Sequence, residues 1–208
     1  MSLSILEAKA MIIVIEGIDG SGKTTQARLL FERIARAGCK VALLIEPTVG
    51  VYGKIIRDKI KSGNYSPMEL YELFLRDRKL NARNIRKLLD LGYIVILDRY
   101  YISTIAYQGA QGIPISRILM DHSEFPIPDV VIILDVDPET ALKRLKRKDT
   151  FENKEFLEQV RTIYLRMPEI LRELKIEIRI INANRDPEII SEDMWNIVRN
   201  LIKCRDKE

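Results

Sequence analysis

Residues 17–24 read GIDGSGKT and match the pattern G-x-x-x-x-G-K-[ST]. An apolar run that favours a strand precedes them, and a periodic run that favours a helix follows them. Glycines let consecutive backbone N–H groups surround phosphate oxygens, and the helix N-terminus adds the positive end of its dipole. Lys23 then reaches the β- and γ-phosphates of a nucleoside triphosphate, and the Thr24 hydroxyl binds Mg²⁺. A glycine-rich turn without a ligand is the alternative, but the strand and helix on either side favour a triphosphate that contacts Gly17, Ile18, Asp19, Gly20, Ser21, Gly22, Lys23, Thr24 and Thr25.

A second group of polar residues follows the apolar run 93–97, where Asp98 and Arg99 stand next to each other. In open α/β sheets, ligands bind at the carboxyl ends of the strands. There Asp98 can hold Mg²⁺ through water, and Arg99 can bind a second phosphate through two parallel hydrogen bonds. Taken alone, the pair is equally compatible with a structural ion pair.

Five short apolar runs predict the strands that position these groups: 11–15, 41–45, 93–97, 130–134 and 176–181. The first four are almost continuously apolar, as expected of parallel strands covered on both faces, whereas the fifth alternates at first and favours a sheet edge. After the first strand, helical spacing and a terminating glycine predict a helix from Ala27, Leu30, Phe31, Ile34 and Gly38. Strand–helix alternation predicts a three-layer α/β fold and one domain over residues 1–208, with 1–10 as an N-terminal extension.

Two further helix starts share a signature, because Asp137-Pro138 and Asp186-Pro187 each place an N-cap acid before proline. The last helix is expected to bury Ile190, Met194, Ile197, Val198 and Leu201. Two segments do not fit simple crossovers: 48–92, expected to form two or three helices outside the core, and the densely charged 144–153. Excursions of this kind often carry binding residues or move as lids.

The composition narrows the class of function. The chain has 208 residues and a net charge of +4, with acids and bases interleaved. This pattern suits a phosphate-bearing small molecule, and no basic stripe or recognition motif indicates nucleic acid. His122 is the one histidine, which excludes a multi-histidine metal site, and the distant Cys39 and Cys204 favour a reducing cytoplasm. No apolar run predicts a membrane span, and residues 1–10 do not resemble a signal peptide.

Three runs carry a resemblance to a known family: IIVIEGIDGSGKTT at 12–25, DRYYISTIAYQG at 98–109 and LDVDPETALKR at 134–144. Together they resemble thymidylate kinase, and the resemblance extends from about residue 11 to the C-terminal helix. The pairing of the first two runs is specific to that family among nucleoside monophosphate kinases. It implies an α/β P-loop kinase fold with a five-stranded, mostly parallel sheet, a helical acceptor-binding region at about 48–92 and a short lid at about 144–153. It also implies ATP and dTMP as substrates, Mg²⁺ as cofactor, a role in dTTP biosynthesis and a homodimer.

The resemblance further implies an acceptor site. Asp19 would hydrogen-bond the 3′-hydroxyl of the acceptor sugar, and Arg99 would bind the acceptor phosphate. Phe74 matches an aromatic residue that stacks on thymine, and Arg78 matches an arginine that hydrogen-bonds the base. Tyr107 matches a ring beneath the sugar that disfavours a 2′-hydroxyl. The other polar positions that match base contacts are Ser103, Thr104 and Gln108.

Phosphoryl transfer to a phosphate needs no general base, because the second pKa of a phosphate, near 6, leaves it largely ionised at neutral pH. Catalysis then depends on positioning and on charge neutralisation by Mg²⁺, Lys23 and arginines such as Arg99. The family supplies one more arginine from the P-loop or from the lid, and Gly20 excludes the P-loop version here. The lid candidates are Arg144, Lys146, Arg147 and Lys148. Arg144 matches a side chain that stacks on the donor adenine, which leaves Arg147 for the transferred phosphoryl group.

Two positions depart from the family pattern, since Thr150 and Ile45 stand where relatives often have arginine. Two alternatives therefore stay open. One is a related kinase with a shifted acceptor, such as dUMP, another monophosphate or a deoxynucleoside. The other is a P-loop switch that binds nucleotide with little turnover. A switch has no need of an acceptor site, so the presence of Asp19, Arg99, Tyr107 and Gln108 favours a kinase.

Overall fold

The computed structural model describes residues 9–145 and 153–202. Within these residues, five parallel strands form one sheet in the order β2-β3-β1-β4-β5. The strands are β1 (Met11–Glu16), β2 (Val41–Ile45), β3 (Ile94–Asp98), β4 (Val130–Asp135) and β5 (Glu177–Asn182). The fold is therefore α/β, and the expected mostly parallel sheet is parallel throughout the described part of the chain.

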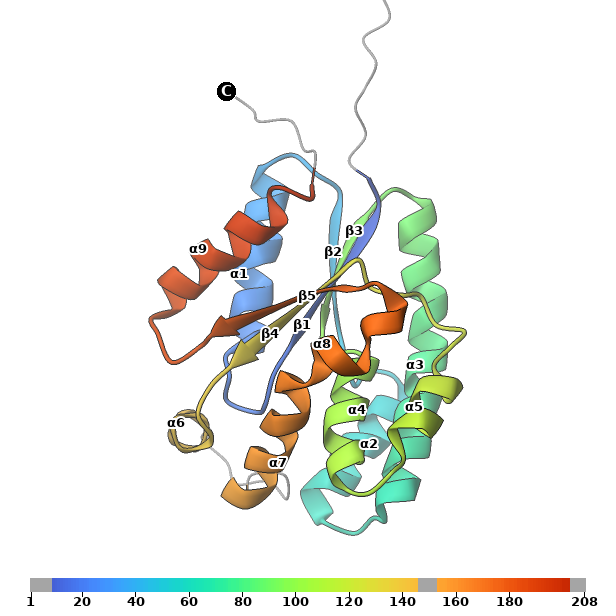
Figure 1. The fold of residues 1–208 in the computed structure, drawn as a ribbon. Coiled ribbons are helices and arrows are strands. Elements are labelled where there is room, and N and C mark those ends of the chain that lie inside the picture. The colour runs from blue at the N-terminus through green and yellow to red at the C-terminus, as the bar shows by residue number, and fades with distance from the viewer. Residues whose placement is uncertain (1–8, 146–152, 203–208) are drawn as a thin grey trace, which may run out of the picture.

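Helices cover both faces of the sheet and give three layers (Figure 1). On one face, α1 (Lys23–Arg36) packs with α9 (Pro187–Val198). The other side carries α2 (Val51–Ser62), α3 (Pro67–Asp90), α4 (Tyr101–Ala110), α5 (Ile115–Asp121) and α7 (Lys154–Leu165). The remaining helical segments are α6 (Pro138–Arg144), α8 (Met167–Ile170) and a short 3₁₀ helix, Arg172–Leu174.

Each predicted strand forms within one residue of its expected bounds. β5 lies at one edge of the sheet, as its alternating sequence predicts. β2 lies at the other edge, and its residues are only partly buried, with Ile45 45% exposed. The prediction that this strand is covered on both faces is wrong, because strand order depends on tertiary packing that an apolar run of five residues does not reveal.

The sequence predicted the positions of three helix ends correctly, but the predicted N-cap side chains do not form capping hydrogen bonds. Gly38 follows α1 with φ +79°, the left-handed conformation that ends helices. Asp137 and Asp186 occupy N-cap positions with proline in the first turn, as expected. Neither carboxylate accepts a capping hydrogen bond, and Asp137 instead lies 3.2 Å from Arg161. Thus α6 starts where predicted, but its capping acid forms an ion pair with α7.

The core confirms most of the expected helix faces. Ala27, Leu30 and Ile34 of α1 are buried, and so are Ile190, Met194 and Val198 of α9. The other members of the two predicted faces, Phe31, Ile197 and Leu201, are partly buried against the same core.

The segment 48–92 forms two helices, α2 and α3, within the predicted range of two or three. The expectation that they lie outside the core is wrong. Leu70, Tyr71, Ala82 and Ile85 of α3 are fully buried, and α3 packs against β3 and α4. One face of α3 packs against the sheet, and residues on a neighbouring face line the cavity that is described below.

Most of the predicted lid lies outside the residues that the structure describes. Of the segment 144–153, the structure describes only Arg144, Leu145 and Asn153; Lys146, Arg147, Lys148 and Thr150 lie outside the described residues. No helix among the described residues has the length and apolar character needed to cross a membrane.

Cys39, just after α1, is disulfide-bonded, although the sequence favours a reducing compartment, where disulfides are rare.

Candidate active site

The loop between β1 and α1 has the backbone shape of a phosphate-binding loop. Gly17, Gly20 and Gly22 have φ values of +141°, +80° and +94°, which side-chain-bearing residues rarely adopt. A Cβ at Gly20 would collide with the backbone of Ala141 in α6, so the loop is held close to that helix. Gly22 is the N-cap of α1, whose first residues, Lys23, Thr24 and Thr25, therefore carry N–H groups free of intrahelical partners. These amides are suited to bind phosphate oxygens.

Lys23 is placed directly over this loop. Its side chain is buried, and the amino group donates to the carbonyl oxygen of Ile18 at 2.7 Å. Burial, followed by repulsion from Arg99, lowers the pKa of Lys23 to about 8, so it remains mainly protonated at neutral pH. The residue can therefore provide a positive charge within reach of any phosphate that the loop binds.

Thr24 and Asp98 meet beside the loop, because β1 and β3 are neighbours in the sheet. The Thr24 hydroxyl donates to Oδ2 of Asp98 at 2.6 Å. A hydroxyl and a carboxylate are hard oxygen donors of the kind that Mg²⁺ prefers, usually together with water and phosphate oxygens. The two predicted metal residues thus fit a Mg²⁺ site, although no cluster of three or more acids, histidines or cysteines able to hold a metal occurs among the described residues.

Arg99, Asp19 and Tyr107 form a second polar group on the far side of the loop. Arg99 follows β3 with φ +72° and forms an ion pair with Asp19 rather than with Asp98. The Tyr107 hydroxyl donates to Oδ2 of Asp19 and accepts from the Asp19 amide, both at 3.0 Å. Burial raises the pKa of Asp19, but the charges of Arg99 and Lys23 outweigh it, so the carboxyl group has a pKa below its usual value. An ionised Asp19 therefore joins the phosphate loop to the neighbouring site.

Glu16, at the end of β1, fixes the position of the residues that follow Arg99 through hydrogen bonds. Its buried carboxylate accepts hydrogen bonds from the Tyr100 amide at 2.8 Å, the Ser103 amide at 3.1 Å, the Ser103 hydroxyl at 2.6 Å and the Tyr164 hydroxyl at 2.8 Å. Burial nevertheless raises the pKa of Glu16. These contacts hold the first turn of α4 directly after the left-handed Arg99, whose guanidinium donates to Ser103 at 3.1 Å.

Arg78, on α3, organises a third polar group. Its Nε donates to Glu46 at 2.7 Å, and its Nη1 donates to the Thr104 hydroxyl at 3.0 Å. Asn81 donates to the other Glu46 oxygen at 3.0 Å. The ion pair is almost completely buried, with 2% of each side chain exposed. Burial raises the pKa of Glu46, and the guanidinium of Arg78 opposes that rise.

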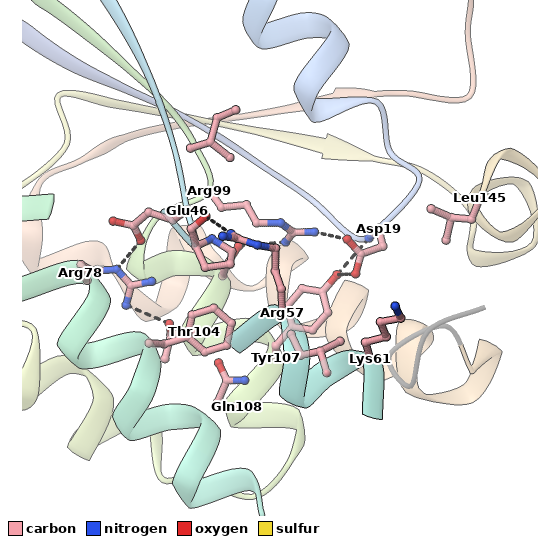
Figure 2. Close-up of a pocket in the computed structure, with 15 residues that line it drawn as sticks. Asp19, Glu46, Arg57, Lys61, Arg78, Arg99, Thr104, Tyr107, Gln108 and Leu145 are labelled. Atoms are coloured by element: carbon pink, nitrogen blue, oxygen red, sulfur yellow. Dashed lines mark hydrogen bonds and ion pairs between the residues drawn. The ribbon is translucent and has the colours of Figure 1, made fainter. Parts of the chain in front are cut away.

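A cavity of about 520 Å³ lies between the second and third polar groups (Figure 2). Its lining includes every residue predicted for an acceptor: Asp19, Phe74, Arg78, Arg99, Ser103, Thr104, Tyr107 and Gln108. Figure 2 shows the Asp19–Arg99 pair at one end and the Arg78–Thr104 contact at the other. The sequence therefore predicted which side chains converge, although they come from the phosphate loop, α3, the end of β3 and α4.

The lining also includes residues that were not predicted to contact an acceptor: Ile45, Glu46, Pro47, Arg57, Ile60, Lys61 and Leu145. Glu46 had a usable signal, because it follows a strand at the same sheet edge as Asp98. Arg57 and Lys61 are four residues apart on α2, a spacing that puts two cations on one helix face. Arg57 donates to the carbonyl oxygens of Pro47 and Thr48, at 3.0 and 2.8 Å. These two residues add positive charge to a wall that has Ile45 where an arginine was expected.

The structure also refines two predicted roles. The Ser103 hydroxyl is already bonded to Glu16, so the residue lies with Arg99 rather than at the Arg78 end. Arg144 is the last residue of α6, the helix that packs against the phosphate loop at Gly20, and it donates to the Ala183 carbonyl oxygen at 3.0 Å. Arg147 lies outside the described residues, so its predicted catalytic role remains a prediction.

Taken together, the geometry combines a triphosphate-binding loop with a cavity that shares Asp19 with it. Cations gather where two phosphates would meet, namely Lys23 and Arg99. His122 is buried against Arg78 and is absent from the cavity lining, so it provides no nucleophile–base pair there. This arrangement suits transfer between phosphates, which needs positioning and charge neutralisation rather than a general base.

Comparison with known proteins agrees with this chemistry. Residues 15–194 match the sequence model of the family described as thymidylate kinase. A probable thymidylate kinase of Archaeoglobus fulgidus is 39% identical over 203 residues, covering 94% of this chain and 98% of the relative. A thymidylate kinase of Brachyspira hyodysenteriae is 38% identical, with 92% and 94% covered. The solved structure of thymidylate kinase from Candida albicans is similar with a TM-score of 0.77 and 28% identity, covering 93% of this chain and 92% of that one.

Proposed function

This chain belongs to the thymidylate kinase family, and we propose that it transfers the γ-phosphoryl group of ATP to dTMP, giving dTDP and ADP. The observation that carries the proposal is the cavity beside the phosphate loop, which is lined by all the expected acceptor residues and shares Asp19 with the loop. A protein that only binds and hydrolyses a triphosphate has no use for such a cavity. The reaction belongs to nucleotide biosynthesis, and its product dTDP is one phosphorylation short of dTTP.

On the donor side, the loop amides and Lys23 bind the phosphates of ATP. Thr24 and Asp98 would hold Mg²⁺, which neutralises phosphate charge when it is bound. Their contact at 2.6 Å supports a shared oxygen site. Arg144, at the end of α6, matches the family position whose side chain stacks on the donor adenine, and we assign it that role.

On the acceptor side, Arg99 binds the dTMP phosphate and Asp19 the 3′-hydroxyl of the sugar. Tyr107, held against Asp19, closes the floor beneath the sugar and disfavours a 2′-hydroxyl. Phe74 stacks on the base and Arg78 hydrogen-bonds it, with the other polar contacts from Thr104 and Gln108. Ser103 acts mainly through Glu16 and Arg99, because its hydroxyl is bonded to them.

The chemistry follows from these positions. An ionised phosphate oxygen of dTMP attacks the γ-phosphorus of ATP, and the bond to the β–γ bridging oxygen breaks with ADP as the leaving group. Lys23 and Arg99 stabilise the negative charge that spreads over the transferring group. Arg147 in the lid is the proposed third cation, and closure of the segment 144–153 would exclude water and prevent ATP hydrolysis.

The domain organisation, oligomeric state, partners and cellular location of the protein are proposed from its resemblance to the family. We expect one catalytic domain over residues 1–208, a homodimer, and no nucleic-acid or membrane partner. We also expect a cytoplasmic location, where ATP and dTMP occur.

The direct test is ADP release from Mg-ATP in the presence of dTMP, dUMP, UMP, CMP, AMP or thymidine. We expect clear preference for dTMP. Faster turnover with another acceptor would retain a kinase but overturn the assignment of the base site. No acceptor-dependent ADP from folded, ATP-binding protein would favour the switch alternative and overturn the proposal.

A further inference from the structure

His122 is a buried ionisable group that the proposed reaction does not use. It follows the last residue of α5 and is only 4% exposed. Aromatic rings surround it, with centroid distances of 6.3 Å to Tyr71, 5.7 Å to Tyr101 and 5.2 Å to Phe125. It does not line the acceptor cavity, so any effect on the ligand must pass through a neighbour.

The hydrogen bonds of His122 define which ring nitrogen carries the proton. Nδ1 lies 2.6 Å from the carbonyl oxygen of Ile118, which can only accept, so Nδ1 carries the hydrogen. Nε2 is then an acceptor, and it lies 2.8 Å from Nη1 of Arg78, which can only donate. Burial and then the charge of Arg78 lower the pKa of His122 to about 3, so the ring stays neutral under ordinary conditions.

This contact completes the bonding of one side of the Arg78 guanidinium. Nε donates to Glu46, and the two hydrogens of Nη1 go to Thr104 and His122. No hydrogen bond joins Nη2 to any described residue. Arg78 lines the cavity, so the nitrogen with both hydrogens available is the one left for a ligand. The partners of Arg78 come from the end of β2, α4 and the end of α5, which fixes the plane of the guanidinium.

We propose that His122 is a positioning residue for base selection: by accepting from Nη1, it holds Arg78 so that Nη2 presents its hydrogens to a carbonyl oxygen of the acceptor base. The proposal rests on the proposed function, because it concerns the same acceptor site. A guanidinium only donates, so it favours a base with a carbonyl oxygen at that point and disfavours one with an amino group. His122 therefore contributes to the choice of thymine over cytosine without touching either.

The test compares four variants with wild type in steady-state kinetics with dTMP and dCMP at saturating Mg-ATP. His122→Gln keeps an acceptor oxygen near the position of Nε2. The methionine of His122→Met has a side chain of similar length to histidine, but its sulfur is only a weak hydrogen-bond acceptor. His122→Asn can still donate to Ile118 but is too short to reach Arg78. Phe125→Leu is the matched control, since it loosens the packing around the same ring without removing the hydrogen bond to Arg78.

We expect His122→Met and His122→Asn to raise the KM for dTMP about tenfold, the factor that corresponds to about 1.4 kcal/mol. Their kcat should stay within about twofold of wild type, and the preference for dTMP over dCMP should fall by a similar factor. His122→Gln should restore both quantities to within about threefold. Phe125→Leu should change neither by more than about twofold.

Three results would overturn the inference. One is that His122→Asn and His122→Met both match wild type in KM and in base preference. Another is that His122→Gln is as impaired as they are, and the third is that Phe125→Leu is equally impaired. Wild-type protein that ignores dTMP in the same assay would instead overturn the proposed function, so the two failures can be told apart. If His122→Met does not fold, His122→Asn and His122→Gln still decide the question.

Discussion

At one end of the acceptor cavity, 2% of each side chain of the Arg78–Glu46 pair is exposed, whereas at the other end Arg99 and Asp19 keep 17% and 34% exposed. The buried pair is held by several further hydrogen bonds from α3, α4 and α5. The partly exposed pair joins Asp19 of the phosphate loop to Arg99, whose backbone has the left-handed conformation. Removing a partner from a buried pair leaves an uncompensated charge, while water readily screens an exposed one. The comparison indicates that the Arg78 end, which we propose binds the base, is fixed in advance, and that the Arg99 end, which we propose binds the phosphate, can exchange partners.

Lys23→Ala should cause the largest loss of activity, because it changes the phosphate loop that adjoins the Arg99–Asp19 end of the cavity. The variant loses the cation above the loop, and we expect kcat to fall by about 10²–10³-fold or more while the fold is retained. The measurement is ADP release with dTMP, together with circular dichroism to check folding. Lys87→Ala, an exposed lysine on α3, is the control and should behave like wild type. Near-normal turnover of Lys23→Ala would rule out the role of the loop.

Glu46→Gln tests the opposite end of the cavity through stability. It leaves the Arg78 charge buried without a counter-charge, and we expect the free energy of unfolding to fall by about 3 kcal/mol. Urea unfolding followed by circular dichroism measures this directly. A loss below about 1 kcal/mol would mean that the buried pair is no more important than a surface pair.

The pH dependence of stability sharpens the same contrast. The pKa of His122 is about 3 in the folded protein and 6.5 in its ordinary state, so the unfolded chain binds more protons between these values. Stability from this group is therefore complete above about pH 6.5 and is lost as the pH falls toward 3. Lowering the pH from 7 to 5 should cost about 2 kcal/mol through His122 alone.

The matched measurement is urea unfolding of wild type and His122→Gln at both pH values. His122 is the one histidine in the chain, so the glutamine variant should lack this part of the slope. Equal slopes for the two proteins would show that His122 is not neutral and buried in solution.

Asp19→Asn should have the smallest effect on stability. Its pair with Arg99 is partly exposed, so we expect the free energy of unfolding to fall by about 1 kcal/mol or less. Acceptor binding should weaken, because the contact proposed for the sugar hydroxyl changes. Measuring both unfolding and the KM for dTMP separates these effects. A stability loss as large as that of Glu46→Gln would remove the difference between the two ends.

Local patterns in the sequence predicted much of this fold. The apolar runs, the glycine after α1 and the phosphate-loop residues are encoded in a few neighbouring positions, and the structure follows them closely. The edge position of β2 was missed because strand order depends on which segments pack together across the whole chain. The same is true of α3, because the segment 48–92 was recognised as helical without any indication of the layer of the fold to which its helices belong.

The candidate site divides in a similar way. The acceptor residues were recognised from motifs, and they line one cavity. Glu16, Glu46 and His122 were missed as supporting groups, because a single acid or histidine has no local pattern and gains its role from distant partners. Arg147 and Thr150 lie outside the described residues, so the lid assignment remains a prediction from sequence.

Asp19 belongs to the phosphate loop and to the acceptor cavity at once, and this has a thermodynamic consequence. A ligand that changes the position or charge balance of Asp19 on one side also alters the free energy of binding on the other. By linkage, the effect of the donor on acceptor affinity must equal the effect of the acceptor on donor affinity. The two substrates are therefore expected to bind cooperatively rather than independently, with one carboxylate as the point of coupling.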